Sequence, residues 1–204
     1  MRVRSLLFLP VAAVLASSCA STRIDEAWMD PQWNGKPVRK ILVVGIAESD
    51  LRRRSFEDLF VGILRERGND ASASYPIIPV IDPQNTPAAE AIIAQGGFDA
   101  ILTARPMGVE TETTVIPGST YYTPTSYYDG FYNYYATTYQ MVSTPDYVAQ
   151  YDIWKVETNV YYAETGKLVW TGQSSTSATG NLQSGIKDFS DVIIGELGKR
   201  GLIR

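Results

Sequence analysis

The fold of this 204-residue chain is decided by residues 38–47, VRKILVVGIA. This short run is rich in β-branched residues, which is typical of a strand that is buried on both faces. Strands of that kind occur in parallel sheets that are covered by helices. The stretch therefore predicts that the domain opens with an inner strand of an α/β sheet.

A helix is predicted directly after this strand. Ser49 or Asp50 is suited to cap its N-terminus, and Gly68 is suited to end it. Between these limits, apolar residues recur at helical spacing and form one stripe: Phe56, Leu59, Phe60, Ile63 and Leu64.

The same alternation continues along the chain. Residues 71–80 predict a second strand, and Thr86 and Pro87 begin a second helix as its cap and first helical residue. Gly96 and Gly97 end that helix, and residues 98–105 (FDAILTAR) predict a third strand. Strands and helices that alternate at this spacing form βαβ units, so part of the sheet is expected to be parallel.

The last third of the chain predicts a hairpin and a final helix. Residues 147–162 alternate between apolar and polar positions, as expected of a half-solvated antiparallel strand. Gly166 supplies the positive φ of a tight connection to a partner strand at 168–174. A C-terminal amphipathic helix follows and ends at Gly201, and Leu202 and Ile203 are expected to pack back on the core.

Between these halves lies a segment with no helical period. Residues 109–116 are strand-like and rich in threonine, and the tyrosine-rich stretch that follows makes the insertion, about 106–147, a hairpin or a loop. Tyrosine offers a flat apolar ring with a polar tip, which suits the recognition of protein or sugar surfaces. A structural hairpin or a loop of biased composition explains the stretch equally well. The candidate binding residues here are Tyr121, Tyr122, Tyr127, Tyr128, Tyr132, Tyr134, Tyr135 and Tyr139.

The first 18 residues have the plan of a signal peptide. Arg2 and Arg4 precede an apolar run, residues 6–15, that is too short to span a bilayer, which needs about 20 apolar residues. Small residues then lead to Cys19, the only cysteine of the chain. The pattern is similar to a bacterial lipoprotein leader, in which that cysteine is acylated and cleavage occurs before it. An ordinary secretory leader, cleaved near Ser17 or Ala20, is the alternative.

Residues 19–37 are predicted to be a tether or N-terminal arm, because turn and breaker signals crowd the segment. Trp28 and Trp33 lie within it, and we expect these rings to dock on the domain rather than to bind a ligand. The mature domain would then span residues 38–204 as a single α/β domain, with a mixed sheet and helices packed on it.

Composition excludes several classes of function. The net charge is −4 and no basic cluster is present that would suit nucleic acid or anionic lipid. The chain has no histidine, which removes the usual nucleophilic triads and the usual zinc sites. Carboxylate catalysis stays open by composition, through Glu48 and Asp50 after the first strand or Glu110 and Glu112 on one strand face. Solvated or capping carboxylates explain these four residues more simply.

Three arginines open the first predicted helix, Arg52, Arg53 and Arg54. Arginine forks suit carboxylate or phosphate, so Arg53 and Arg54 are candidates for an anion-binding edge. The alternative is a surface ion-pair network, because Arg53 with Glu57 and Arg54 with Asp58 have i,i+4 spacing.

Three short motifs carry a resemblance to known proteins: LVVG at 42–45, FDAILT at 98–103 and ETGKLVW at 164–170. With them, the chain resembles bacterial envelope lipoproteins of poorly characterised function, whose α/β domain is related to penicillin-binding-protein activators and to the curli secretion lipoprotein. The resemblance covers about residues 38–203, and the tyrosine-rich stretch departs from it. By similarity to lipoproteins generally, Ala20 after the cysteine implies sorting to the outer membrane.

We therefore expect a non-enzymatic protein with no metal and no cofactor. It would be held at the periplasmic face of the outer membrane by palmitate-type acyl chains on Cys19, as a scaffold or regulator that binds an envelope protein. A glycan- or peptidoglycan-binding module is the second hypothesis, and a carboxylate-dependent hydrolase is the third.

The anchor predicts the outcome of a single substitution. Cys19→Ala removes the only residue that can be acylated in this way, so the protein is expected to leave the membrane fraction. Fractionation followed by immunoblotting measures this. An unchanged distribution would refute the lipoprotein interpretation.

Overall fold

The structure, a computed structural model, describes residues 21–33, 37–78, 86–123, 140–177 and 181–204. The leader with Cys19 lies outside the described residues, and so do six of the candidate tyrosines: Tyr127, Tyr128, Tyr132, Tyr134, Tyr135 and Tyr139.

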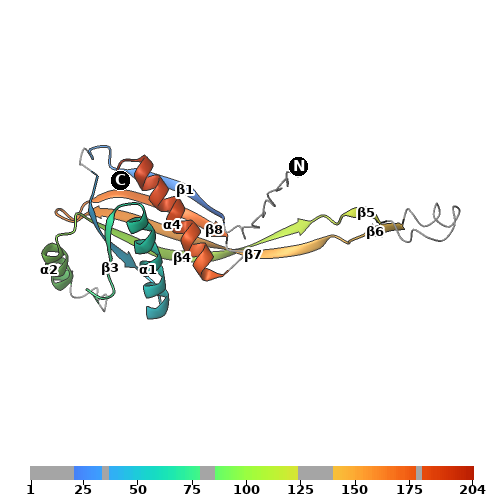
Figure 1. The fold of residues 1–204 in the computed structure, drawn as a ribbon, viewed down its shortest axis with the longest axis horizontal. Helices are drawn as coiled ribbons and strands as arrows, with labels where there is room; N and C mark the ends of the chain where they lie inside the picture. The colour runs from blue at the N-terminus through green and yellow to red at the C-terminus, as the bar shows by residue number, and fades with distance from the viewer. Residues whose placement is uncertain (1–20, 34–36, 79–85, 124–139, 178–180) are drawn as a thin grey trace, which may run out of the picture.

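The fold is α/β, as predicted, and is built on one six-stranded mixed sheet (Figure 1). Its strands lie in the order β1-β8-β7-β4-β2-β3, and β5 and β6 form a separate two-stranded ladder. The strands are β1 (Ser21–Met29), β2 (Lys40–Gly45), β3 (Asp70–Ala73), β4 (Ala100–Ile116), β5 (Thr120–Thr123), β6 (Gln140–Ser143), β7 (Tyr147–Tyr162) and β8 (Leu168–Ser177). The helices are α1 (Asp50–Glu66), α2 (Thr86–Gly96) and α4 (Leu182–Lys199).

The βαβ part of the prediction is confirmed. Strand β2 pairs in parallel with both β3 and β4, and the remaining pairs of the large sheet are antiparallel. The strand expected at 71–80 is shorter than predicted: β3 ends at Ala73. Directly after it, the backbone N–H groups of Ser74 and Tyr75 donate to the carboxylate of Glu57, and the chain turns.

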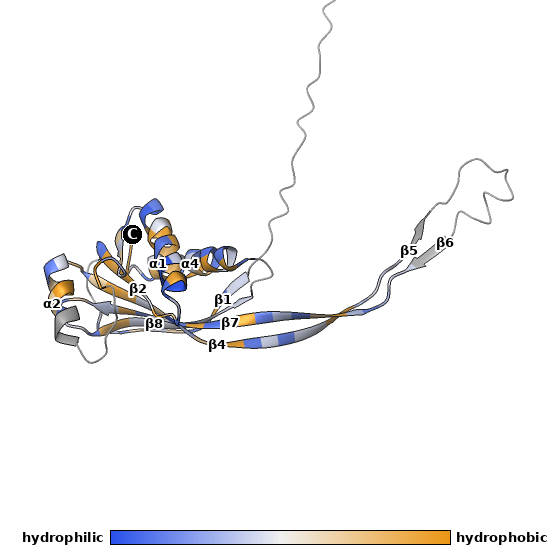
Figure 2. Ribbon diagram, turned by 90° about the horizontal axis from the view of Figure 1, so that it is seen from below, coloured by the Kyte–Doolittle hydropathy of each residue, from blue (hydrophilic) through white to orange (hydrophobic). Residues whose placement is uncertain are grey.

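The core lies between the sheet and two helices. Helices α1 and α4 cover one face of the sheet, as Figures 1 and 2 show. The rings of Phe56, Phe60 and Phe189 meet there with centroid distances of 5.5 to 6.2 Å. Leu202 and Ile203 are buried, as predicted, and the Leu202 carbonyl accepts from the N–H of Val38 at 2.8 Å.

The segment expected to be a tether is, over nine residues, the edge strand β1. It pairs antiparallel with β8 from Ser21 opposite Ser177 to Met29 opposite Trp170. A register shift between Ile24 and Glu26 breaks the alternation that would have revealed a strand in the sequence.

The two tryptophans of this segment behave differently. Trp33 packs edge-on against Tyr162 with ring centroids 5.4 Å apart, as the docking prediction required. Trp28 is 48% exposed, so the prediction is wrong for this ring.

Strand β4 joins two segments that the sequence separated at Pro106. A β-bulge between Pro106 and Gly108 places Met107 as the extra residue, which lets the strand continue past a proline. Strand β7 has the predicted bounds and pairs with β4 along its full length, from Ala100 opposite Tyr162 to Ile116 opposite Tyr147.

Among the described residues, no helix combines the length and the hydropathy that crossing a membrane would require.

Candidate functional site

The first candidate site is a projecting pair of strands. On one side, β2 pairs with β4 only as far as Ala104, and on the other, β8 pairs with β7 only from Ile153. Residues 111–116 of β4 and 147–152 of β7 therefore pair only with each other in the described part of the chain. We call this two-stranded segment the ribbon, and Figure 1 shows it extending away from the sheet and helices.

The far end of the ribbon carries exposed apolar side chains. Val115 lies opposite Val148 and Ile116 lies opposite Tyr147, so each pair shares one face of the ribbon. Val115 and Val148 are each 61% exposed, Tyr147 is 59% exposed and Ile116 is 36% exposed. The hydropathy colouring marks this end as an apolar band (Figure 2). Both faces of the ribbon therefore present apolar contact area to solvent.

The half of the ribbon nearer the sheet is acidic instead. The hydroxyl of Tyr151 donates to Glu112 at 3.0 Å and that of Thr111 donates to Asp152 at 2.9 Å. The hydrogen bond to Glu112, helped by its negative charge, raises the pKa of Tyr151. Residues 106–116 and 147–152 contain no lysine or arginine. The ribbon thus has an anionic base and an uncharged end.

Beyond the ribbon, the tyrosine-rich segment begins as a hairpin. Tyr121 pairs with Val142 and Tyr122 pairs with Met141 in the ladder of β5 and β6. The hairpin alternative is therefore confirmed for its two arms. The binding role of the tyrosines stays a prediction.

A second candidate is a hollow of about 570 Å³ that β1, β8, β7 and β4 all line. The ammonium of Lys155 donates to the Ser175 hydroxyl at 2.8 Å, and that hydroxyl donates to Asp25. Lys155 also lies 3.7 Å from Asp25 and 3.6 Å from Glu110. The sequence did not indicate this cluster, because Asp25 and Ser175 are 150 residues apart.

Charge compensation dominates the hollow. Burial acts to raise the pKa of Asp25, but hydrogen bonds from Ser175 and Arg23 and the charge of Lys155 outweigh it, so this pKa lies below its ordinary value. The Ser175 hydroxyl is buried and used both as donor and as acceptor, and its neighbour Lys155 donates to it. Asp25, which accepts the hydrogen bond of the hydroxyl, is a weak base because its pKa is lowered, and Lys155 donates to the hydroxyl oxygen, so the geometry favours a structural cluster over an activated nucleophile.

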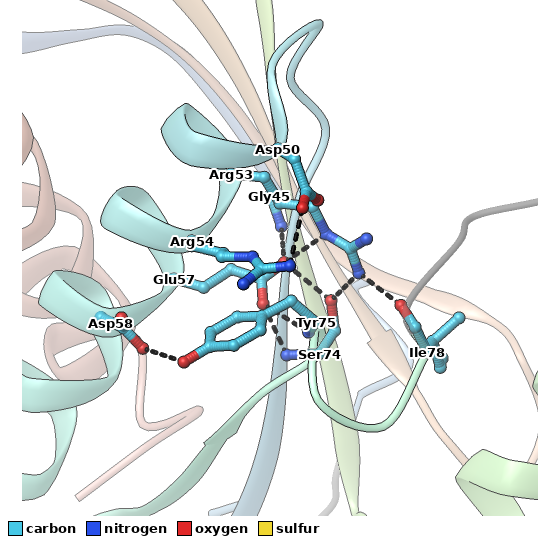
Figure 3. Close-up of polar contacts among 9 residues, drawn as sticks. All are labelled: Gly45, Asp50, Arg53, Arg54, Glu57, Asp58, Ser74, Tyr75 and Ile78. Carbon is cyan, nitrogen blue, oxygen red and sulfur yellow. Dashed lines mark hydrogen bonds and ion pairs between the residues drawn. The ribbon is translucent and has the colours of Figure 1, made fainter.

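Arg53 lies in a buried network, not at an anion-binding edge (Figure 3). Its guanidinium donates to Glu57 at 3.0 Å, to the Ser74 hydroxyl at 2.7 Å and to the Ile78 carbonyl at 2.9 Å. Arg53 is 5% exposed and Glu57 is fully buried. The pairing of Arg53 with Glu57 is as predicted, but both the anion-edge and the surface-network interpretations are wrong for Arg53, because its partners are internal.

Glu57 is the centre of this network. Besides Arg53, its carboxylate accepts from the N–H of Gly45 at 2.9 Å, of Ser74 at 2.7 Å and of Tyr75 at 2.9 Å, and from the Ser74 hydroxyl at 2.7 Å. One side chain of α1 thereby ties together the ends of β2 and β3. A carboxylate with so many donors needs no further ligand to satisfy it.

Arg54 pairs with a different partner from the one predicted. It donates to Asp50 at 2.7 Å, while Asp58 accepts from the Tyr75 hydroxyl at 3.1 Å (Figure 3). Its guanidinium lies over the Tyr75 ring, 5.3 Å from the centroid, so Tyr75 separates Arg54 from Asp58. Both charges of the pair are exposed, as the surface-network interpretation expected.

The structure also shows where the other carboxylates considered for catalysis lie. Glu110 and Glu112 lie on one face of β4, and Glu48 is exposed after β2. Within the described ranges, no group of three or more Asp, Glu, His and Cys side chains is placed to hold a metal ion.

Comparison with known proteins gives distant structural neighbours only. No protein-family model matches the chain, and no curated protein sequence matches it. A variant PelC dodecamer from Paraburkholderia phytofirmans is 13% identical at a TM-score of 0.44, covering 86% of this chain and 96% of that one. A second PelC dodecamer structure from that organism is 13% identical at a TM-score of 0.43, covering 91% and 99%. Lipoprotein GNA1162 from Neisseria meningitidis is 12% identical at a TM-score of 0.42, covering 79% and 99%.

The network around Glu57 predicts that a conservative substitution of this residue strongly destabilises the fold. Glu57→Gln keeps the shape of the side chain but removes the negative charge that faces Arg53. The new amide NH₂ is itself a donor, and it would face backbone N–H groups that now donate to the carboxylate. We expect a loss of about 3 to 5 kcal/mol in the free energy of unfolding, as for other broken buried pairs. Urea unfolding measures it. The matched control is Asp50→Asn, which breaks the exposed pair with Arg54 and should cost at most about 1 kcal/mol. Equal losses in the two variants would contradict the assignment.

The hollow predicts a pH dependence with a definite sign. The pKa of Asp25 is lowered on folding, so the ionised carboxylate stabilises the folded state above its unfolded pKa of about 3.9, and this stability is lost as pH falls through the folded value. Asp25→Asn removes the titration. Between about pH 5 and pH 2, the free energy of unfolding should fall more steeply for the wild type than for the variant. Parallel pH curves would show that Asp25 is not held in this way.

Proposed function

We propose that this chain is a lipid-anchored binding protein of the bacterial envelope that engages a protein partner through the ribbon. It acts as a scaffold or regulator on the periplasmic face of the outer membrane, without chemistry of its own. The observation that carries the proposal is the pair of exposed apolar cross-strand contacts at the far end of the ribbon, Val115 with Val148 and Ile116 with Tyr147.

The low intrinsic stability of an isolated two-stranded ribbon supports the proposal that a partner binds it. A two-stranded hairpin is marginally stable in water, because little apolar area is buried and both edges expose unpaired backbone groups. Contiguous exposed apolar residues on a monomer commonly mark a contact surface. A partner that covers Val115 and Val148 would remove apolar area from water, at about 25 cal/mol for each Å² buried.

The place of the anchor supports an envelope partner. Only one residue separates Cys19 from Ser21, where β1 begins, and two residues span at most about 7 Å. Ser21 lies opposite Ser177, which lies opposite Ile153 at the base of the ribbon. A lipid on Cys19 would therefore attach close to the root of the ribbon, and the partner would be reached at the membrane surface.

A glycan ligand is the second candidate. The tyrosines of the hairpin would serve as stacking platforms, as the composition of the segment suggests. Peptidoglycan sedimentation of the full chain and of a chain that lacks residues 121–139 tests it, since equal sedimentation would exclude a role for this segment.

The protein-binding proposal predicts the effect of changing the far end of the ribbon alone. The double variant Val115→Asn, Val148→Asn keeps the fold, because both side chains are exposed, but removes the apolar contact. Crosslinking of the anchored protein in its native envelope, with quantitative mass spectrometry, should recover the partner at least about tenfold less, as expected for a lost pair of interface contacts. The matched control is Thr113→Ser, Gln150→Asn, the next polar pair on the same face. Unchanged recovery with the double variant would refute the proposal.

A further inference from the structure

The edge of β4 that faces away from β7 is open over a long stretch. The ladder of β2 with β4 ends at Gly45 opposite Ala104, and the Ile46 N–H then donates to the Ala104 carbonyl before the chain turns into α1. In the described part of the chain, no strand pairs with residues 108–116 on that side. We call residues 108–116 the free edge of β4. On β7 the corresponding open stretch, residues 147–152, is shorter.

The free edge is protected at its beginning and unprotected at its end. Strand edges avoid unwanted pairing through bulges, prolines and charges. Pro106, the bulge at Met107 and the carboxylates of Glu110 and Glu112 supply all three devices near the sheet. The four residues that follow, 113–116 (TTVI), are uncharged and β-branched, which are the residues that favour strand pairing. The sequence therefore leaves an attractive edge where the ribbon is farthest from the body.

Charge on this edge distinguishes among the strands that could add to it. Glu110 and Glu112 lie two residues apart, so both point to the same face, and both are exposed. Among the described residues, Glu110 pairs with Lys155 at 3.6 Å, and Glu112 accepts one hydrogen bond from Tyr151. Each carboxylate can accept further hydrogen bonds. A second copy of this chain would bring another ribbon without lysine or arginine, and the whole chain carries a net charge of −4.

We infer that the free edge of β4 receives an extended segment of a different protein, which adds as a strand and carries two basic residues at alternate positions opposite Glu110 and Glu112. Uncharged, largely apolar residues of the same segment lie opposite residues 113–116. Backbone hydrogen bonds along the edge supply affinity, and the two charge pairs fix the register. This inference rests on the proposed function and adds to it the mode of binding and the chemistry of the partner.

The experiment is site-specific photocrosslinking in cells of the organism that makes the protein. A photoreactive amino acid is placed in turn at Thr111, Thr113 and Val115 of the full anchored chain, three positions on one face of β4. Leu51, which is 75% exposed on α1, is the control position. The crosslinked residue of the partner is then identified by mass spectrometry for each position.

Strand addition predicts that each step of two residues along β4 moves the crosslink by two residues along the partner. The crosslinked partner segment should contain lysine or arginine at alternate positions. The double variant Glu110→Gln, Glu112→Gln should reduce the crosslink at Val115 by about tenfold, because two cross-strand charge pairs are lost, and more at low salt. A charge-reversed partner segment, tested against Glu110→Lys, Glu112→Lys, should restore it.

Four results would overturn the inference: crosslinks to a second copy of the chain, crosslinks to lipid, crosslinks scattered without register, or a partner segment without basic residues. Scattered crosslinks to one protein would leave the proposed function standing and remove only the binding mode. The absence of any protein crosslink from the three ribbon positions would overturn both.

Discussion

The ladder between β4 and β7 extends beyond the strands that flank it. This difference in strand length separates the packed sheet from the projecting ribbon. The ladder runs from Ala100 opposite Tyr162 to Ile116 opposite Tyr147, while β2 and β8 accompany only its first part. Where the ladder is part of the six-stranded sheet, one face packs under α1 and α4 and forms the core. Where only two remain, no helix covers them in the described chain, and their side chains and edges meet solvent. One element thus serves both as core strand and as projecting arm.

The buried carboxylate of Glu57 fills the region beyond the ends of the parallel strands β2 and β3. In open α/β sheets, ligands commonly bind beyond the carboxyl ends of the parallel strands. Here the N–H groups of Gly45, Ser74 and Tyr75 all point to the Glu57 carboxylate, which Arg53 neutralises (Figure 3). An internal side chain therefore occupies the place that a ligand would otherwise take. The proposed contact surfaces, the ribbon and the free edge of β4, lie elsewhere, where β4 pairs antiparallel with β7.

Strand β1 limits how far the domain could move from the proposed lipid anchor. A tether of some twenty residues would let the domain move away from the membrane, but a strand that begins at Ser21 and is paired with β8 leaves almost no slack. The row of Ser21, Ser177 and Ile153 connects the start of β1 directly to the base of the ribbon. In the proposed function, a lipid on Cys19 would couple position at the membrane to presentation of the ribbon and would raise the effective concentration of the binding surface near an envelope partner.

The sequence by itself determined the α/β class, the parallel βαβ half, the bounds of β7, the stripe of α1 and the return of Leu202 and Ile203 to the core. These features depend on local periodicity and on turn residues, which a sequence displays directly. Only the tertiary structure decided that residues 21–29 form a strand, that β4 continues past Pro106, that Arg53 is buried and that the ends of β4 and β7 pair only with each other in the described chain. Each of these depends on which distant segment lies alongside: Asp25 meets Ser175 across 150 residues, and Glu57 of α1 meets Ser74, 17 residues later and just after β3. Periodicity shows which side chains share a face, but a strand's neighbours, and the places where it has none, are fixed only when the whole sheet assembles.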